Sequence, residues 1–147
     1  MSNIIIRPAT QNDADAIYGF VCDLEDEEFD KAAFDTCYQL CLAGAKNHYL
    51  VAEINNEAVG YISCQGQVLL HHTGLVYEIQ ELFVKAEYRN KNIGKLLLQA
   101  MEELIGKEDY VLLEVSSNMQ RKDAHRFYLS NGFKLTNYRF KKAPDKK

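Results

Sequence analysis

The chain has 147 residues, of which 47% are hydrophobic and 26% are charged, and its formal net charge is -4. This is the balance of an ordinary globular protein, and we expect a single domain over residues 1–147. The negative charge argues against nucleic acid as a partner, because binding to its phosphates needs a basic face.

The sequence also favours a cytoplasmic protein without a membrane partner. Its apolar runs are far shorter than a membrane span, and residues 1–6 lack the basic start of a signal peptide. Its cysteines form no CxxC pair, so we expect reduced thiols rather than a disulfide framework.

The first half of the chain predicts a strand, two helices and two further strands. Residues 3–7 have the β-branched composition of a strand. Thr10, followed by Asp13, can cap a helix, and Asp30 can cap a second one. Further strands are expected at 48–54 and 58–70, with a polar turn between them.

The second half alternates strands and helices. Apolar residues recur at helical spacing after residue 92, which is the best helical signal in the chain. Gly132 is suited to a left-handed helix stop. The predicted strands lie at 76–84, 110–116 and 133–141, and the predicted helices at 93–104 and 122–131. The resulting fold class is α+β, a mixed and mostly antiparallel sheet with helices on its faces.

The turn before the third predicted helix has the properties of a phosphate site. A helix start offers unpaired N–H groups and the positive end of the helix dipole. Gly94 lets the backbone approach a ligand closely, and Asn92 tolerates left-handed geometry. Arg89, Lys91 and Lys95 add positive charge. Taken alone, the turn is equally consistent with an ordinary basic helix start.

The pattern from Arg89 through Asn92 to Gly94 resembles the acyl-CoA signature Q/R-x-x-G-x-G/A of the GNAT N-acetyltransferases, with Asn92 in place of the first glycine. The order of predicted elements is similar to that fold from Ile4 to about Phe140. The resemblance implies a central sheet splayed in the middle and an acetyl-CoA-dependent N-acetyltransferase.

Further stretches resemble the aminoalkylphosphonate N-acetyltransferase subfamily. They are spread along the chain and lie at residues 28–30, 70–72, 78–82, 89–94, 123–129 and 138–140. The resemblance implies that the acceptor is a small primary amine of this type. It also suggests a homodimer.

Acetyl transfer to an amine needs a base, because an alkylammonium has a pKa of about 10. Glu78 and Glu81 are the candidates, since both interrupt an otherwise apolar strand. A regular strand would place them on opposite faces. The family resemblance implies a bulge here, which would change that parity. We favour Glu78 as the base, acting through a water, with Glu81 second. Either residue could instead be a solvent-facing glutamate.

Tyr128 is the candidate acid for the departing thiolate. It lies in the pattern Phe-Tyr-x-x-x-Gly-Phe, whose tyrosine approaches the cofactor sulfur in GNAT enzymes, and the alternative is a core tyrosine. Asn118 matches an asparagine that commonly contacts the cofactor, although it could be a simple turn residue. The resemblance implies cofactor contacts at Leu82, Phe83, Val84, Arg89, Asn90, Lys91, Asn92, Ile93, Gly94, Lys95, Asn118, Phe127 and Tyr128.

The remaining candidates concern the acceptor and a metal. A phosphonate is negatively charged and binds best to arginine or lysine. The start of the fourth predicted helix is surrounded by the basic residues Arg121, Lys122, His125 and Arg126. Each could equally belong to a solvated helix face. The histidines match no zinc spacing. The phosphonate resemblance leaves a divalent metal open, with His71, His72 and Glu78 as its first candidates.

Other readings keep the fold and change the activity. The acceptor could be a polyamine, an arylalkylamine, an amino acid or a protein N-terminus. The chain could also be a CoA-binding domain without turnover. Glu78 and Tyr128, both at matched positions, speak for an enzyme.

Overall fold

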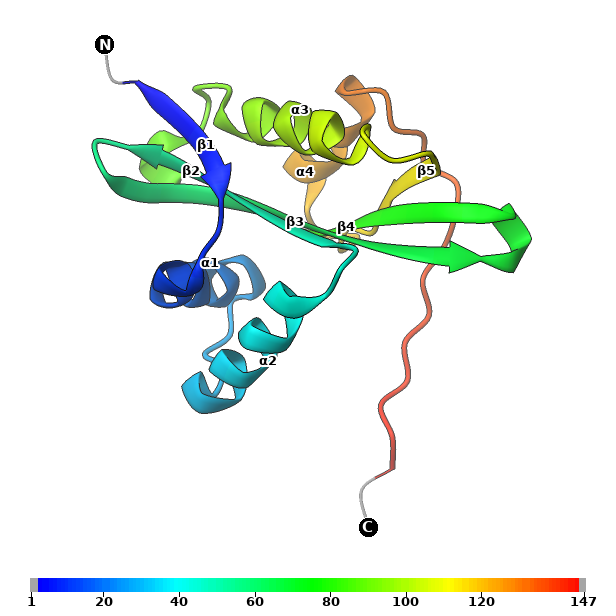
Figure 1. The fold of residues 1–147 in the computed structure, drawn as a ribbon, viewed down its shortest axis with the longest axis horizontal. Helices are drawn as coiled ribbons and strands as arrows, with labels where there is room; N and C mark the ends of the chain where they lie inside the picture. Colours follow the sequence, from blue (N-terminus) through cyan, green and yellow to red (C-terminus); the bar gives the residue numbers. More distant parts are fainter. Residues whose placement is uncertain (1–2, 146–147) are drawn as a thin grey trace.

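A five-stranded sheet in the order β1-β2-β3-β4-β5 forms the centre of the structure, a computed structural model that describes residues 3–145 (Figure 1). Neighbouring strands run antiparallel, except that β4 and β5 are parallel. The strands are β1 (Ile4–Pro8), β2 (Asn47–Ile54), β3 (Glu57–Leu69), β4 (Gly74–Val84) and β5 (Tyr110–Val115). The predicted mixed, mostly antiparallel sheet is confirmed.

Helices cover both faces of this sheet, as predicted. Figure 1 shows α1 (Ala14–Glu25) and α2 (Lys31–Ala43) on one side. On the other side lie α3 (Ile93–Ile105) and α4 (Lys122–Ser130). Short 3₁₀ turns join the elements at η1 (Gln11–Asp13), η2 (Leu70–His72) and η3 (Ala86–Tyr88). None of the helices within residues 3–145 has the length and apolar character needed to span a membrane.

The predicted helix caps are confirmed. The Thr10 hydroxyl accepts a hydrogen bond from the Asn12 amide, and the Asp13 carboxylate accepts one from the Thr10 amide. The Asp30 carboxylate accepts one from the Ala33 amide at 2.8 Å. Gly132 adopts a φ of 93°, a left-handed conformation that prevents helix α4 from continuing.

Helix α3 packs against one face of the sheet and begins directly after the basic turn at residues 89–92. Its buried side chains repeat along one stripe, and each stabilises the fold by about 1.5–3 kcal/mol when fully buried. They are Ile93, Leu97, Leu98, Met101 and Ile105. Because Ile93 is the first residue of α3, the start of the helix is fixed against the sheet.

The predicted closing strand at residues 133–141 is wrong. This segment has no strand neighbour within residues 3–145, and Figure 1 shows it running past β5 and away from the body. Leu135, Tyr138 and Phe140 are 88%, 89% and 92% exposed. The apolar alternation of a strand is present in the sequence, but a strand also needs a backbone partner.

Candidate active site

The start of α3 is arranged to receive an anion. Asn92 stands at its N-cap with a φ of 64°, and within the described residues its side chain caps no amide. The first amides of a helix have no partner inside the helix, so those of Ile93, Gly94 and Lys95 point outward at its positive end. Asn90 also has a positive φ, of 63°. Left-handed geometry was expected from the sequence at Asn92 and is found there, and Asn90 adopts it as well.

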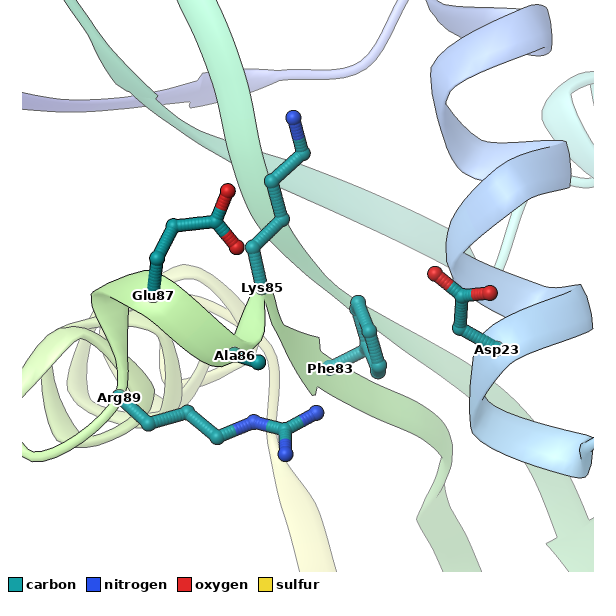
Figure 2. Close-up of a pocket in the computed structure, with 6 residues that line it drawn as sticks. All are labelled: Asp23, Phe83, Lys85, Ala86, Glu87 and Arg89. Carbon is teal, nitrogen blue, oxygen red and sulfur yellow. The ribbon is translucent and has the colours of Figure 1, made fainter.

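Arg89 is held by the protein itself. Its Nε donates to the Val84 carbonyl at 2.9 Å, and its guanidinium lies 5.4 Å from the centre of the Phe83 ring. Arg89 also lines a hollow of about 440 Å³ at the end of β4, and Figure 2 shows its side chain reaching toward Phe83. The hollow is lined by Asp23, Phe83, Lys85, Ala86, Glu87 and Arg89. Arg89 thus joins the basic turn to the strand on which the candidate base lies.

Beyond its middle, β4 separates from β5. The last paired residues are Ile79 and Val115, after which the chain turns from β5 toward α4. β4 continues along β3 alone, with Leu82 opposite Ile62. In the part of the chain that the structure describes, the other edge of residues 80–84 has no strand partner. An open edge of this kind can pair with an extended ligand that carries amides.

A β-bulge places the candidate bases on one face of the sheet. Glu81 lies opposite Ser63 and Ile79 opposite Cys64, so Gln80 is an extra residue in β4. Glu78 lies opposite Gln65. Ser63 and Gln65 are two residues apart in β3 and share a face, so their partners do as well. The bulge implied by the family resemblance is present, and it reverses the parity of a regular strand.

Glu78 lies where β4 and β5 begin to separate. One of its carboxylate oxygens, Oε2, accepts a hydrogen bond from Nη2 of Arg139 at 2.6 Å. The same oxygen lies 3.3 Å from the Ser116 hydroxyl. Glu114 of β5 is its register partner, so a second carboxylate follows on the same face. The side chain of Glu78 is 29% exposed and can be reached from solvent.

Glu81 is the member of the pair whose carboxyl is desolvated, although the residue is only partly buried. Burial raises the pKa of its carboxyl, while hydrogen bonding to Ser63 lowers that pKa in part. The Ser63 hydroxyl donates to the Glu81 carboxylate, and the Glu81 amide donates back to the same hydroxyl at 3.0 Å. Desolvation is the dominant cause, because a buried carboxylate loses its hydration. Two hydrogen bonds with Ser63 therefore hold both the side chain and the backbone of Glu81 in place.

Tyr128 lies on α4, between the rings of Phe127 and Phe133, with each ring centroid 5.5 Å away. Burial raises its pKa to about 12, and the charge of Arg121 offsets part of that effect. Arg121 also donates to the Leu24 carbonyl at 2.7 Å and pairs with Glu25, which ties the start of α4 to the end of α1. A tyrosine with a raised pKa keeps its proton at neutral pH.

Two other predicted cofactor residues have clear structural contacts. Phe127 packs against the core, and its ring lies 3.6 Å from the position that a Cβ on Gly94 would take. The Asn118 side chain accepts a hydrogen bond from the Gln120 amide, and the Asn118 carbonyl lies 2.8 Å from Nε2 of His125. Asn118 therefore shapes its own turn, as the simpler interpretation of this residue expected.

The arrangement gives no support for a divalent metal. Across residues 3–145, no three histidine, cysteine, aspartate or glutamate side chains cluster as metal ligands would. His71 and His72 lie on η2 at the tip of the β3–β4 hairpin. Glu78 lies four residues beyond Gly74 in β4, which is about 13 Å along an extended strand.

Sequence reasoning missed Arg139 as a site residue. It noted residues 138–140 only for their resemblance, whereas the structure brings the Arg139 guanidinium onto Glu78. A signal was present, because Arg139 is a basic residue between the outward-facing Tyr138 and Phe140. Alternation alone places Arg139 on the opposite side of the segment.

Comparison with known proteins identifies the family of the chain. Residues 45–135 match the family described as "Acetyltransferase (GNAT) domain". The chain is 41% identical over 138 residues to the aminoalkylphosphonate N-acetyltransferase of Salmonella typhimurium, covering 94% of this chain and 90% of that protein.

Solved structures share the fold at lower identity. A Bacillus halodurans protein described as a transcriptional regulator has a TM-score of 0.87 at 22% identity, covering 96% of this chain and 99% of that one. An aminoglycoside N-acetyltransferase in complex with CoA also has a TM-score of 0.87, at 14% identity, covering 98% and 96% of the two chains. The chain therefore belongs to the GNAT acetyltransferase family and is an acetyl-CoA-dependent N-acetyltransferase.

Proposed function

We propose that this protein transfers the acetyl group of acetyl-CoA to the primary amine of a small aminoalkylphosphonate. The similarity to a relative with that named activity extends over 94% of the chain and supports this acceptor class. The observation that carries the chemistry is the bulge at Gln80. It aligns Glu78 and Glu81 on one face, where β4 separates from β5.

The residues at the start of α3 fit the pyrophosphate of the cofactor. Amides at the positive helix end would bind its oxygens, and the exposed Lys91 and Lys95 would add charge. The open edge of residues 82–84 would pair with the amides of the pantetheine arm, mainly at Leu82 and Phe83. The Val84 carbonyl already accepts a hydrogen bond from Arg89.

Glu78 would start the reaction by taking a proton from the bound ammonium through a water. The freed amine lone pair attacks the thioester carbon, and a tetrahedral intermediate with a negative oxygen forms. This intermediate collapses when the carbon–sulfur bond breaks. Tyr128 then gives its proton to the departing thiolate, and the amide nitrogen returns its second proton to the tyrosinate by way of water.

Glu78 is preferred to Glu81 as the base because it can exchange protons with solvent. Its side chain is 29% exposed, whereas the partly buried Glu81 is bound to Ser63 and has a pKa raised by desolvation. Glu81 would instead add negative charge beside the acceptor. Glu78, Glu81 and Glu114 share this face, and together they favour a cationic amine over a neutral one.

The test is a thiol-release assay with acetyl-CoA and a panel of amines. The panel contains aminoethylphosphonate, a polyamine, an arylalkylamine, an amino acid and a peptide N-terminus, each with and without a chelator. We expect the highest kcat/KM with aminoethylphosphonate. A higher value with another amine would reassign the acceptor. Binding of acetyl-CoA without thiol release for any amine would indicate a non-catalytic domain.

We also propose that two copies associate through the outer side of the C-terminal segment, residues 133–141. Leu135, Tyr138 and Phe140 are almost fully exposed there, and Val111 of β5 is 55% exposed. A symmetric dimer would cover these side chains. We expect light scattering to give twice 16.9 kDa for the wild type and 16.9 kDa for the double variant Tyr138→Asp with Phe140→Asp. A wild-type monomer at high concentration would refute the dimer.

A further inference from the structure

The ion pair between Arg139 and Glu78 joins two distant parts of the chain at the candidate site. Arg139 comes from the C-terminal segment and Glu78 from the middle of β4. The arginine side chain is 56% exposed and the glutamate 29%, so a ligand can reach both groups. The pair presents one cationic and one anionic group side by side at the surface of the candidate site.

Three of the four basic residues expected to bind a phosphonate are engaged elsewhere, and the fourth, Lys122, is exposed at the start of α4. Arg121 is bound to the Leu24 carbonyl and to Glu25. Arg126 pairs with Asp123 on the same helix, where both side chains are mostly exposed. His125 lies on the Asn118 carbonyl. Of the cations discussed, Arg139 is the one that contacts the candidate base.

A guanidinium has more donors than this ion pair uses. It carries five N–H groups in a planar fork, and the contact with Glu78 occupies Nη2. The remaining donors can bind two oxygens of a phosphonate while Nη2 stays beside the carboxylate. The face around Glu78 is otherwise acidic, with Glu81 and Glu114 on it, so a dianion needs such a local cation.

We propose that Arg139 is the specificity-determining residue that binds the anionic group of the acceptor and so places its amine on Glu78. An aminoalkylphosphonate carries an ammonium and a phosphonate on a short carbon chain. Its ammonium matches the Glu78 carboxylate and its phosphonate matches the Arg139 guanidinium. The positive group of the acceptor thus faces the negative side chain of the pair, and its negative group faces the positive one. This inference rests on the proposed acetylation of aminoalkylphosphonates.

The test compares an acceptor that has the anion with one that lacks it. In Arg139→Ala we expect KM for aminoethylphosphonate to rise roughly tenfold to a hundredfold, the range for a lost hydrogen bond to a charged group. KM for propylamine and for acetyl-CoA should stay within about twofold of wild type. Arg139→Lys should fall between, because a lysine keeps the charge but loses the fork. Lys134→Ala, on the same segment, is the matched control and should leave all KM values unchanged.

Calorimetry separates this inference from the proposed function. Binding of methylphosphonate and aminoethylphosphonate to the CoA complex needs no turnover, and we expect both to weaken in Arg139→Ala. If wild type binds aminoethylphosphonate but does not acetylate it, the proposed function fails and the Arg139 assignment still stands. Equal binding to wild type and Arg139→Ala, or an equal rise in KM for both amines, would overturn the assignment.

Discussion

The two halves of the site are built in different ways. The cofactor half uses one continuous segment, from Arg89 to Lys95, and it offers mainly backbone amides at the start of α3. The acceptor half uses side chains from β4, β5 and the C-terminal segment, which meet at Glu78. A backbone site tolerates side-chain changes, whereas a side-chain site is altered by each of them.

This difference assigns a separate task to each half. In the proposed mechanism, the cofactor half fixes where a phosphate lies and therefore governs binding. The acceptor half places a carboxylate where a proton must be taken and therefore governs turnover and selectivity. Substitutions in the two halves should consequently change different kinetic constants.

The largest effect is expected from Glu78→Gln. Loss of the base should lower kcat at neutral pH by roughly 10²- to 10⁴-fold. Activity should recover in part as pH rises toward the acceptor pKa of about 10, because more of the amine is then already neutral. The measurement is a pH–rate profile of thiol release with wild type and variant, and affinity for acetyl-CoA should not change.

Glu81→Gln is the matched control for this comparison. If Glu81 were the base, its loss would give the larger fall in kcat and the recovery at high pH. Such a result would transfer the role of Glu78 to the buried residue.

The next effect is expected from Tyr128→Phe. Removing the hydroxyl leaves the ring between Phe127 and Phe133, so packing should persist. We expect kcat to fall roughly 10²-fold, at the lower end for a general acid, with KM for acetyl-CoA little changed. Phe133→Leu serves as a packing control. A rise in KM with unchanged kcat would show that Tyr128 only packs against the cofactor.

The same contrast explains what could be predicted from the sequence. The helix start at residues 93–95, its left-handed Asn92 and the caps at Thr10 and Asp30 follow from local signals, and the structure confirms them. The shared face of Glu78 and Glu81 required the bulge, which came from family resemblance. Strand spacing alone gave the opposite answer.

Residues 133–141 and Arg139 escaped prediction because their state depends on distant partners. Alternating apolar residues are necessary for a strand, but the sequence does not say whether a neighbouring backbone is free to pair. The contact between Arg139 and Glu78 spans 61 residues of sequence, so no local window contains it.

A smaller effect is expected from Gly94→Ala, a substitution that should change cofactor binding without lowering stability. A Cβ there would lie 3.6 Å from Phe127, an ordinary contact, and alanine favours a helix over glycine by up to about 1 kcal/mol. Gly94→Ala should therefore leave the free energy of unfolding unchanged or slightly higher. If a pyrophosphate approaches this backbone, KM for acetyl-CoA should rise roughly tenfold, the factor for one charged hydrogen bond. Enzyme kinetics and urea unfolding test both statements. An unchanged KM would show that the pyrophosphate does not approach the backbone at Gly94.

The smallest effect concerns the pH dependence of stability at Glu81. Burial raises the pKa of this carboxyl in the folded chain above its ordinary value of 4.5, so the folded state binds the proton more tightly than the unfolded state does. The resulting stability is fully present below pH 4.5 and is lost as pH rises through the higher folded pKa. Glutamine at this position does not titrate. As pH rises from 4.5 through the folded pKa, wild type should therefore lose unfolding free energy relative to Glu81→Gln. Urea unfolding at a series of pH values measures it. A difference that stays flat with pH would mean that the hydrogen bond from Ser63 compensates fully for the desolvation of Glu81, in which case the acceptor half holds its second carboxylate without cost to the fold.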